Sequence, residues 1–416
     1  MNETPSDPGS QTHSRLVIIS IVVAALGYFV DIYDLLLFSI VRIKSLQDLG
    51  VSGEQLLSQG VLLLNMQMGG MLIGGVLWGI LGDKKGRLSV LFGSIALYSI
   101  ANLLNGLVQN IEQYAVLRLI AGIGLAGELG AGITLVSELM SRNKRGYGTT
   151  IVASVGLFGA VFGAYIASIF HWRTAYFIGG GLGLLLLLLR VSLFESGMYN
   201  RLKAATVTKG NFWMLFQQRE RFLKYLCCIL IGLPIWYAIG ILITFSPEFG
   251  KALGMPVTAL PVPGESVKYA YIGLALGDLA SGLLSQLWRS RKKVVFTFLG
   301  LTGLSIATYF SFGGQSLTAF YACCGFVGFA IGYWAVFVTI ASEQFGTNIR
   351  STVTTSVPNF IRGTVVPLTL AVEASKGSLG LPGAAIAIGG VTLVIAALCL
   401  IPLEETFGKD LDYLED

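Results

Sequence analysis

Charged residues are scarce in this sequence, and so is histidine. Of 416 residues only 12% are charged and two are histidine, whereas 54% are apolar. A soluble domain carries about twice that share of charged residues, because it needs polar side chains to cover its surface. The composition therefore argues against a soluble enzyme, a disordered regulator and a nucleic-acid-binding protein. It indicates a chain whose surroundings are mostly lipid.

Cysteine is also scarce, and its placement argues against a metal site or a disulfide. All five cysteines lie inside apolar runs, where a thiol packs as a small hydrophobic group. Neighbours such as Cys227 and Cys228 would point about 100° apart on a helix, a poor geometry for sharing a metal ion. His13 and His171 offer no credible Ser-His-Asp arrangement. We therefore expect no metal, no cofactor and no enzymatic activity.

Long apolar runs, in contrast, recur along the whole chain. After a polar start, the run from Leu16 to Val41 is too long for a cleavable signal peptide. A spanning helix needs about 20 apolar residues to cross roughly 30 Å of hydrocarbon. The sequence therefore predicts an all-α integral membrane protein with twelve transmembrane helices, at residues 16–41, 56–81, 88–108, 112–139, 148–170, 174–194, 223–247, 267–288, 294–313, 316–342, 352–374 and 381–403.

The distribution of Lys and Arg predicts the orientation. When both termini are placed on one side, most Lys and Arg residues outside the spans fall in the loops of that side. The positive-inside rule then puts both termini in the cytoplasm. We expect a multi-pass protein of a bacterial inner (plasma) membrane. Its expected partners are the lipid bilayer, a small-molecule substrate and protons, with no nucleic acid, and we expect a monomer.

An internal repeat indicates two related halves. The loop sequences SELMSRNKRG and SEQFGTNIRS start at Ser137 and Ser342, an offset of 205 residues, and each places Arg seven residues after Glu. A weaker echo pairs LGDKKGR at Leu81 with RSRKKVV at Arg289. Duplicated six-helix halves are a recurrent transporter plan. We predict a cytoplasmic tail at 1–15, a six-helix half at 16–194 and a basic cytoplasmic linker at 195–222. A second six-helix half at 223–403 and an acidic cytoplasmic tail at 404–416 follow.

Several of these motifs resemble signatures of the major facilitator superfamily. GILGDKKGR at 79–87 is similar to the motif between that family's second and third helices, and RLIAGIGLAGELG at 118–130 to its fourth-helix motif. ESGMY at Glu195 resembles a degraded form of the acidic motif after helix 6. EQFGTNIR at 343–350 is similar to the motif after helix 10, although Gly346 stands where proline is usual. The resemblance implies two pseudo-symmetric six-helix halves and transport by alternating access.

The branch that the chain most resembles contains proton-coupled symporters of metabolites, phosphate and organic acids, with sugar-porter-like members beside them. DIYDLLLFS in the first span and Gly-Glu-Leu in the fourth point there, and the fifth span lacks the proline of the drug-antiporter signature. We therefore expect a secondary active transporter that couples protons to symport of a small organic or inorganic anion. A uniporter or drug-type exporter of the same fold, and a non-transporting membrane sensor, are the alternatives.

Ionisable side chains inside spans are costly and mark functional sites by default. Asp31 and Asp34 lie three residues apart, on one face of the first span, and Arg118 lies at a similar depth in the fourth. We expect Arg118 to pair with Asp34 or Asp31 in the central cavity, which the resemblance implies is lined by helices 1, 4, 7 and 10. A moving pair of this kind suits proton coupling, and a static pair that braces two helices is the alternative.

Four further charged side chains well inside the predicted spans are also candidates. Glu128, near the middle of the fourth span with no obvious cation, is a second candidate for proton or substrate binding, or else a satisfied structural acid. Asp278 and Arg362 share a depth in the eighth and eleventh spans and either pair with each other or face the cavity. Arg190 is expected to snorkel toward the interface.

The second half contributes aromatic pairs rather than charge. Trp236 and Tyr237 lie in the seventh span, and Tyr333 and Trp334 in the tenth. We expect one member of each pair to face the cavity, where an aromatic wall opposite a charged wall suits a small organic ion. Contacts with lipid or between helices are the alternative. Pro234 predicts a kink that could serve as a hinge.

The loop motifs are interpreted as conformational latches that do not touch substrate. Acidic and basic groups at helix ends can brace neighbouring helices through the helix dipole. We expect Glu138 to pair with Arg145, and Glu343 with Arg350, inside their own halves. The complete set of latch candidates is Gly79, Asp83, Gly86, Arg87, Glu138, Arg145, Glu343 and Arg350.

Overall fold

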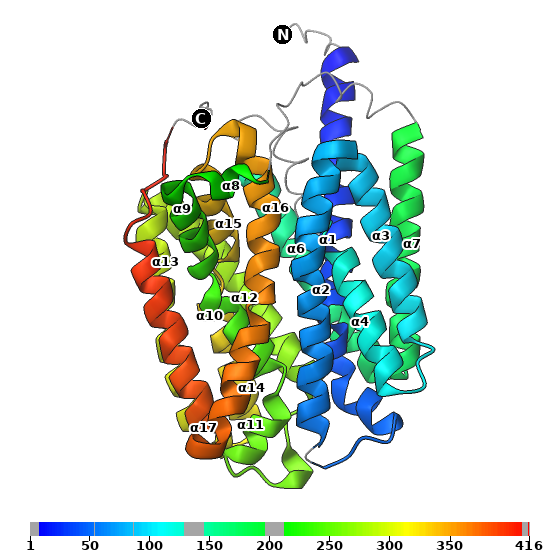
Figure 1. Ribbon diagram of the computed structural model, residues 1–416, viewed down its shortest axis with the longest axis vertical. Coiled ribbons are helices and arrows are strands. Elements are labelled where there is room, and N and C mark those ends of the chain that lie inside the picture. Colours follow the sequence, from blue (N-terminus) through cyan, green and yellow to red (C-terminus); the bar gives the residue numbers. More distant parts are fainter. Residues whose placement is uncertain are drawn as a thin grey trace, which may run out of the picture.

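The molecule consists of two helical bundles that stand side by side. The computed structural model describes residues 8–53, 55–85, 87–128, 145–195, 212–409 and 415. These residues form helices and their connections, and no strand occurs among them. Figure 1 shows the earlier helices in one bundle and the later helices in the other.

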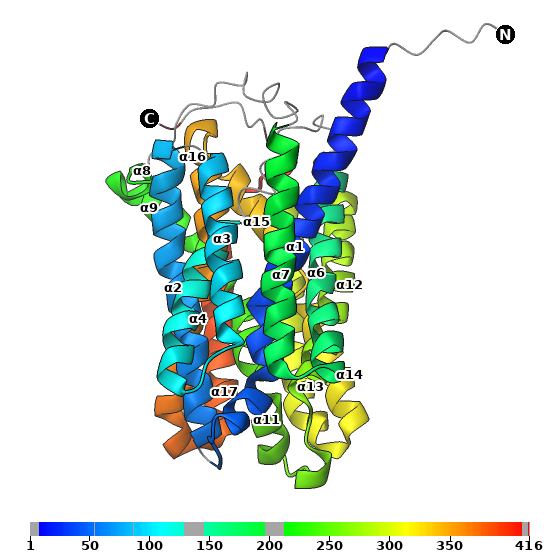
Figure 2. The same cartoon turned by 90° about the vertical axis from the view of Figure 1, so that its right-hand side faces the viewer.

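The first bundle contains long helices that cross the whole molecule. Figure 2 shows α1 running obliquely through it, with α7 and α3 in front. The described helices of this bundle are α1 (Pro8–Asp48), α2 (Gln55–Lys85), α3 (Arg87–Asn105), α4 (Ile111–Leu125), α6 (Arg145–Ile169) and α7 (Trp172–Glu195).

The second bundle is more broken, because several of its spans consist of two helical pieces. Its helices are α8 (Met214–Gln217), α9 (Arg219–Leu230), α10 (Leu233–Tyr237), the π-helix η1 (Ala238–Ile243), α11 (Ser246–Ala252), the 3₁₀ turn η2 (Val257–Ala259), α12 (Pro263–Leu287), α13 (Arg291–Phe312), the 3₁₀ turn η3 (Gly313–Gln315), α14 (Leu317–Ala330), α15 (Trp334–Glu343), α16 (Thr347–Gly363) and α17 (Val365–Leu400).

The helices match the predicted spans closely. Among the described residues, eight helical segments are long and apolar enough to cross a membrane, and two shorter apolar helices, Val90–Asn105 and Val155–Ile169, accompany them. One of the eight, Asn348–Leu400, bends into two legs at Gly380, whose φ of +70° lies in the left-handed region that suits glycine. Together with α4, these segments correspond to the twelve predicted spans, although the last part of the fourth span, 129–139, lies outside the described residues.

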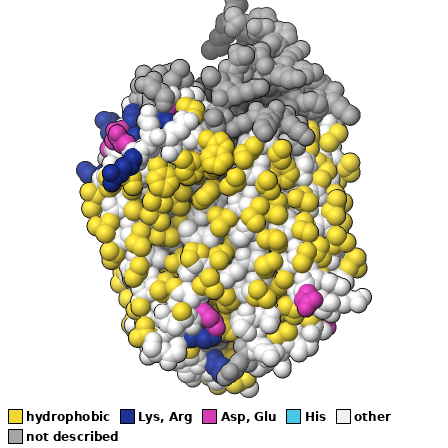
Figure 3. All heavy atoms as spheres, viewed as in Figure 1, with side chains coloured by type: hydrophobic (Ala, Val, Ile, Leu, Met, Phe, Trp, Pro, Cys, Tyr) yellow, Lys and Arg dark blue, Asp and Glu magenta, His cyan; other side chains and the backbone are white. Residues whose placement is uncertain are grey.

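The surface and the chain ends agree with a membrane protein. Hydrophobic side chains cover the middle of the face drawn in Figure 3, and charged groups lie toward its two ends. In Figure 1, α1 begins and α17 ends at the same end of the molecule, which we call the upper end. The opposite, lower end carries α11 and the connection between α1 and α2.

Glycines let helices cross closely in both bundles at equivalent places. A Cβ on Gly122 of α4 would lie 2.1 Å from the backbone oxygen of Gln67 in α2. A Cβ on Gly328 of α14 would lie 1.9 Å from the backbone oxygen of Ala270 in α12. Their separation of 206 residues is close to the offset of the loop repeat. The duplication therefore extends from the loops to the packing of the helices, where small residues permit close approach.

Candidate functional site

Two spans of the second bundle are interrupted partway along their length. The chain leaves regular helix at Ile231 and Gly232, between α9 and α10, and again from Ile331 to Tyr333, between α14 and α15. Pro234 lies in α10, and a π-helix follows directly, so the kink expected at Pro234 is part of a longer irregular stretch. Discontinuous helices of this kind commonly form the binding sites of transporters.

Arg362 lies between two indole rings beside these interruptions. Its guanidinium carbon lies 5.6 Å from the ring centroid of Trp236 in α10 and 5.7 Å from that of Trp334 in α15. The side chain of Arg362 is buried, and its Nε and Nη1 atoms have no hydrogen-bond partner among the described residues. The indole nitrogen of Trp236 is buried and unpartnered as well, and that of Trp334 lies near the Tyr28 hydroxyl without a hydrogen bond of ordinary geometry. We call these three side chains the Arg362 cage.

The two tyrosines beside these tryptophans point elsewhere. The Tyr237 hydroxyl donates to the backbone oxygen of Ala385 in α17 at 2.6 Å. The Tyr333 hydroxyl donates to the backbone oxygen of Ile231 at 3.0 Å. Both tyrosines therefore brace helices inside the second bundle, and each tryptophan is the member of its pair that faces the central charge.

Asp278 accepts a hydrogen bond from the backbone and does not pair with Arg362. Its Oδ1 accepts the N–H of Ala335 at 3.1 Å, in the first turn of α15. A carboxylate stabilises a helix at this position, because the first N–H groups are unpaired and the helix dipole is positive there. No ion pair joins Asp278 to Arg362 in the described structure, so the pairing alternative for these two residues is wrong.

Asp31 is a buried carboxylate that approaches Arg362 from the other bundle. Neither of its oxygens has a hydrogen-bond partner among the described residues, and its side chain is fully buried. It interacts electrostatically with Arg362 of α16 and with Glu128 and Arg190 of the first bundle. A carboxylate and a guanidinium from opposite halves thus lie near each other without forming a close ion pair.

Asp34 lies one turn further along α1 and turns toward α7. A Cβ on Gly179 of α7 would lie 2.2 Å from Asp34 Oδ1, so the absence of a side chain there makes room for the carboxylate. Asn102 and Arg118 lie near it, but neither Asp34 oxygen accepts a hydrogen bond of ordinary geometry. Asp34 is therefore a second buried carboxylate without a close cation.

The expected ion pair of Arg118 with Asp31 or Asp34 is wrong. Arg118 Nη1 donates to the Tyr176 hydroxyl at 3.4 Å, and the guanidinium carbon lies 4.8 Å from the centroid of the Phe38 ring. All three charged groups are fully buried, as expected for positions inside the spans. Their rotation about the helix axes was not predicted, because Arg118 turns toward an aromatic cluster and Asp34 turns toward Gly179.

Glu128 has a cation, and Arg190 does not snorkel, so both expectations are corrected. Arg190 Nη2 lies 2.8 Å from Glu128 Oε1, and both side chains are buried. The Tyr98 hydroxyl donates to Glu128 Oε2 at 3.2 Å. A Cβ on Gly27 of α1 would lie 2.0 Å from Arg190 Nη2, so a glycine provides the space for this pair. Of the two alternatives for Glu128, a proton or substrate site and a satisfied structural acid, the geometry favours the structural acid.

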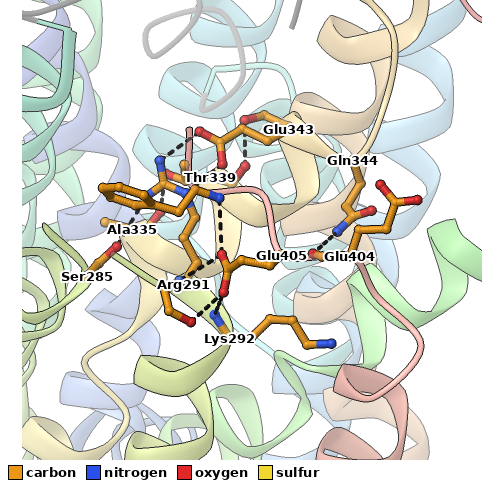
Figure 4. A network of polar contacts seen from close by, with 12 residues as sticks. Ser285, Arg291, Lys292, Ala335, Thr339, Glu343, Gln344, Glu404 and Glu405 are labelled. Atoms are coloured by element: carbon orange, nitrogen blue, oxygen red, sulfur yellow. Dashed lines mark hydrogen bonds and ion pairs between the residues drawn. The ribbon is translucent and has the colours of Figure 1, made fainter. Parts of the chain in front are cut away.

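The latch around Glu343 is present with a different partner. Arg291 of α13 contacts Glu343 through two hydrogen bonds, Nε to Oε2 at 2.6 Å and Nη2 to Oε1 at 2.8 Å (Figure 4). Arg350, the expected partner, instead donates to the backbone oxygens of Ser342 at 3.0 Å and Phe345 at 3.2 Å. The prediction of a Glu343–Arg350 pair is wrong, because the chain turns at Gly346 and Arg350 faces the end of α15.

The acidic tail completes this upper network. Burial alone would raise the pKa of the Glu405 carboxyl, but the Ser290 hydroxyl and the N–H groups of Arg291, Phe407 and Lys292 donate to it and lower its pKa below the usual range. Figure 4 shows Glu405 turned toward the start of α13. The tail is thereby fixed to the same loop that holds Glu343.

The other latch candidates are described only in part. Gly79 lies in α2, and a Cβ there would meet no atom within 4 Å. Gly86 and Glu138 lie outside the described residues. The side chains of Asp83, Arg87 and Arg145 also lie outside the described part of the structure.

Sequence reasoning missed Arg42, which closes the lower end. Arg42 Nη2 lies 2.7 Å from Glu248 Oε2 in α11, and its guanidinium carbon lies 4.6 Å from the Phe245 ring centroid. Beside it, the Thr244 hydroxyl donates to the Ser39 hydroxyl at 3.1 Å. Both contacts join residues about one repeat apart, 206 and 205 positions. The repeat offset was the signal that could have identified them.

The fold and the buried charges define a transport protein of the membrane, and comparison with known proteins agrees. The cis,cis-muconate transport protein of Acinetobacter baylyi is 26% identical over 383 residues, which cover 87% of this chain and 89% of that protein. The 3-(3-hydroxy-phenyl)propionate transporter of Escherichia coli is 26% identical over 311 residues, with 71% and 74% covered.

Solved structures and family membership give the same result. The proton:xylose symporter XylE superposes with a TM-score of 0.69 at 17% identity, over 96% of this chain and 98% of XylE, which establishes the shared fold. The sequence model of the Major Facilitator Superfamily matches residues 17–363. The chain belongs to this superfamily. It is a transporter with twelve helices in two halves, and it is not an enzyme.

Proposed function

We propose that this protein is a proton-coupled symporter that imports a small organic anion by alternating access. We place it as a monomer in a bacterial inner membrane with both termini in the cytoplasm. The observation that carries the proposal is the buried carboxylate of Asp31, which has no hydrogen-bond partner and interacts electrostatically with the buried guanidinium of Arg362 in the opposite half, whose Nε and Nη1 also lack partners. Uncompensated charges inside a membrane are costly and are kept for function.

Coupling follows from competition for Arg362. Without substrate, Arg362 provides the positive charge that faces Asp31. An anion that binds Arg362 takes over that charge, and Asp31 then gains from binding a proton. The other charged groups near Asp31 are Asp34 on α1 and the Glu128–Arg190 pair. That pair is already balanced, so the exchange between anion and proton depends on Asp31, Asp34 and Arg362.

Alternating access is supported by the contacts at the lower end. Arg42–Glu248 and Ser39–Thr244 tie α1 of one half to η1 and α11 of the other. We assign this state as closed toward the outside. Opening requires these contacts to break, after which the halves can rock about the central site.

The named substrates of the relatives support an organic anion. Muconate and 3-(3-hydroxyphenyl)propionate, which the two relatives are named for, are both carboxylates. The site in this chain offers cations and N–H donors at its centre, which suit a carboxylate.

The test is uptake into proteoliposomes driven by a pH gradient, alkaline inside. Labelled nicotinate, cis,cis-muconate and inorganic phosphate are offered, and uptake into protein-free liposomes is subtracted. We expect uphill uptake of an organic anion that disappears when a proton ionophore is added. Asp31→Asn or Asp34→Asn lowers uphill uptake to background while substrate exchange across the membrane survives, because binding persists and the proton site is lost.

Glu265→Gln provides the matched control. Glu265 lies in the first turn of α12, where it pairs with Lys268 at a partly exposed position, so the same change from acid to amide should leave uptake unaltered. Uphill accumulation at wild-type level in both aspartate variants would refute proton coupling through α1. Downhill uptake that ignores the gradient in the wild type would identify a uniporter.

A further inference from the structure

We propose that the Arg362 cage is the carboxylate subsite of this transporter, and that its ligand is a planar, aromatic or conjugated monocarboxylate. The inference rests on the proposed function and narrows its substrate class. It starts from the convergence of Arg362 with Trp236 and Trp334, whose rings flank the guanidinium.

The cage presents donors that lack acceptors. Nε and Nη1 of Arg362 and the indole nitrogens of Trp236 and Trp334 are all buried without a hydrogen bond of ordinary geometry among the described residues, and the Tyr28 hydroxyl lies near the Trp334 nitrogen. A buried donor without an acceptor is expensive to keep. A ligand that supplies acceptors and no donors satisfies all of them, which fits a carboxylate better than a sugar, because sugar hydroxyls also need acceptors.

Charge limits the ligand to a monoanion. Arg362 provides one positive charge, and the carboxylates of Asp31 and Asp278 lie near the same central region, since both interact electrostatically with Tyr28, as Arg362 does. A phosphate dianion placed there would face two carboxylates with one cation. A monocarboxylate adds only one negative charge, which Arg362 can balance once Asp31 has bound the proton of the proposed exchange.

The shape of the site favours a flat body. The walls beside Arg362 are indole rings, with the Phe337 ring behind Trp334 at a centroid distance of 5.4 Å. Aromatic rings pack against one another in offset or edge-to-face geometry and gain about 0.5–1.5 kcal/mol beyond area burial. A planar ligand can use these walls, whereas a puckered ring of equal charge cannot.

Equilibrium titration of the purified full-length protein tests the proposal. Tryptophan fluorescence is recorded while benzoate or cyclohexanecarboxylate is added, since these acids share charge and size but differ in planarity. We expect saturable quenching by benzoate, and cyclohexanecarboxylate should bind about threefold to tenfold more weakly. Arg362→Gln weakens benzoate binding by about 10- to 100-fold, because hydrogen bonds to a charged group are lost.

Two tryptophan variants distinguish loss of a contact in the Arg362 cage from a general effect of replacing any tryptophan. Trp334→Phe keeps a ring and removes one N–H donor, so it should weaken benzoate binding by about threefold to tenfold. Trp288→Phe is the matched control, because Trp288 is exposed at the end of α12 and should leave the affinity unchanged. Thermal melting of each variant with and without benzoate verifies folding and reports binding independently.

The outcomes distinguish this inference from the proposed function. Three results would overturn the proposal that the Arg362 cage is the carboxylate subsite. They are equal affinity for the two acids, absence of benzoate binding, and wild-type affinity in Arg362→Gln. Gradient-driven phosphate uptake that persists in Arg362→Gln overturns the cage and leaves symport intact. Benzoate binding that depends on Arg362, without gradient-driven uptake of any anion, supports the cage and refutes symport.

Discussion

Single residues of this protein show two ways of keeping charge inside a membrane. Glu128 and Arg190 are matched at 2.8 Å in a space that Gly27 leaves open. Such a pair is costly to break because one charge would remain uncompensated. Asp31 and Arg362 are near each other and unmatched. We interpret the first arrangement as structural, and in the proposed mechanism the second changes partners during the transport cycle.

Glu405 gives a prediction at the same scale, outside the membrane. Its pKa is lowered in the folded protein, so its contribution to stability is present above the unfolded pKa of about 4.3 and is lost as pH falls through the folded value. Glu405→Gln should lower the melting temperature at pH 7 and lower it less at pH 3. The effect is at most about 1 kcal/mol, because the carboxylate is partly exposed and screened.

Thermal melting in detergent at the two pH values measures this effect. Glu265→Gln, at a partly exposed carboxylate outside the upper network, is the control. A melting temperature that falls equally at both pH values would show that the amide disturbs the tail for a reason other than charge.

The sequence located most site residues and mispaired several of them. The apolar runs locate the spans, so Asp31, Asp34 and Arg118 were expected inside helices, and all three are buried. Rotation about the helix axis depends on packing, which a hydropathy pattern does not contain. The partners of Arg118 and Glu128 therefore could not be predicted from the sequence.

Helical elements carry the duplication and also depart from it. Both halves cross their helices at glycines, Gly122 over Gln67 and Gly328 over Ala270. The spans themselves were predictable, because each is a long apolar run. The interruptions of the second half were harder to foresee, since only Pro234 signalled one of them. They place Trp236 and Trp334 beside Arg362.

Alanine at the crossing glycines tests this view of the elements. In Gly122→Ala or Gly328→Ala the new Cβ meets a backbone oxygen that cannot rotate away, so each variant should lose about 1–3 kcal/mol of stability. Gly282→Ala is the control, because a Cβ there has open space and alanine favours the helix. The melting temperatures of the three variants and the wild type in detergent measure this loss of stability. Equal melting of all three variants and the wild type would show that the crossings are loose.

The whole molecule combines a closed lower end with a charged centre that spans both halves. Arg42–Glu248 and Ser39–Thr244 hold the lower ends of the halves together at positions related by the repeat. Above them, Asp31 belongs to one half and Arg362 to the other. A movement of one half against the other changes the distance between these two groups. In the proposed mechanism, this distance links proton binding, anion binding and the direction of opening.

Proton uptake upon substrate binding tests that link most directly. Benzoate is added to the purified protein in weakly buffered solution at pH 7, and a pH indicator records protons taken up as binding saturates. The wild type should take up protons in proportion to bound benzoate, whereas the double variant Asp31→Asn, Asp34→Asn should bind benzoate without proton uptake. Binding without proton uptake in the wild type, or equal uptake in the double variant, would contradict coupling through Asp31 and Arg362.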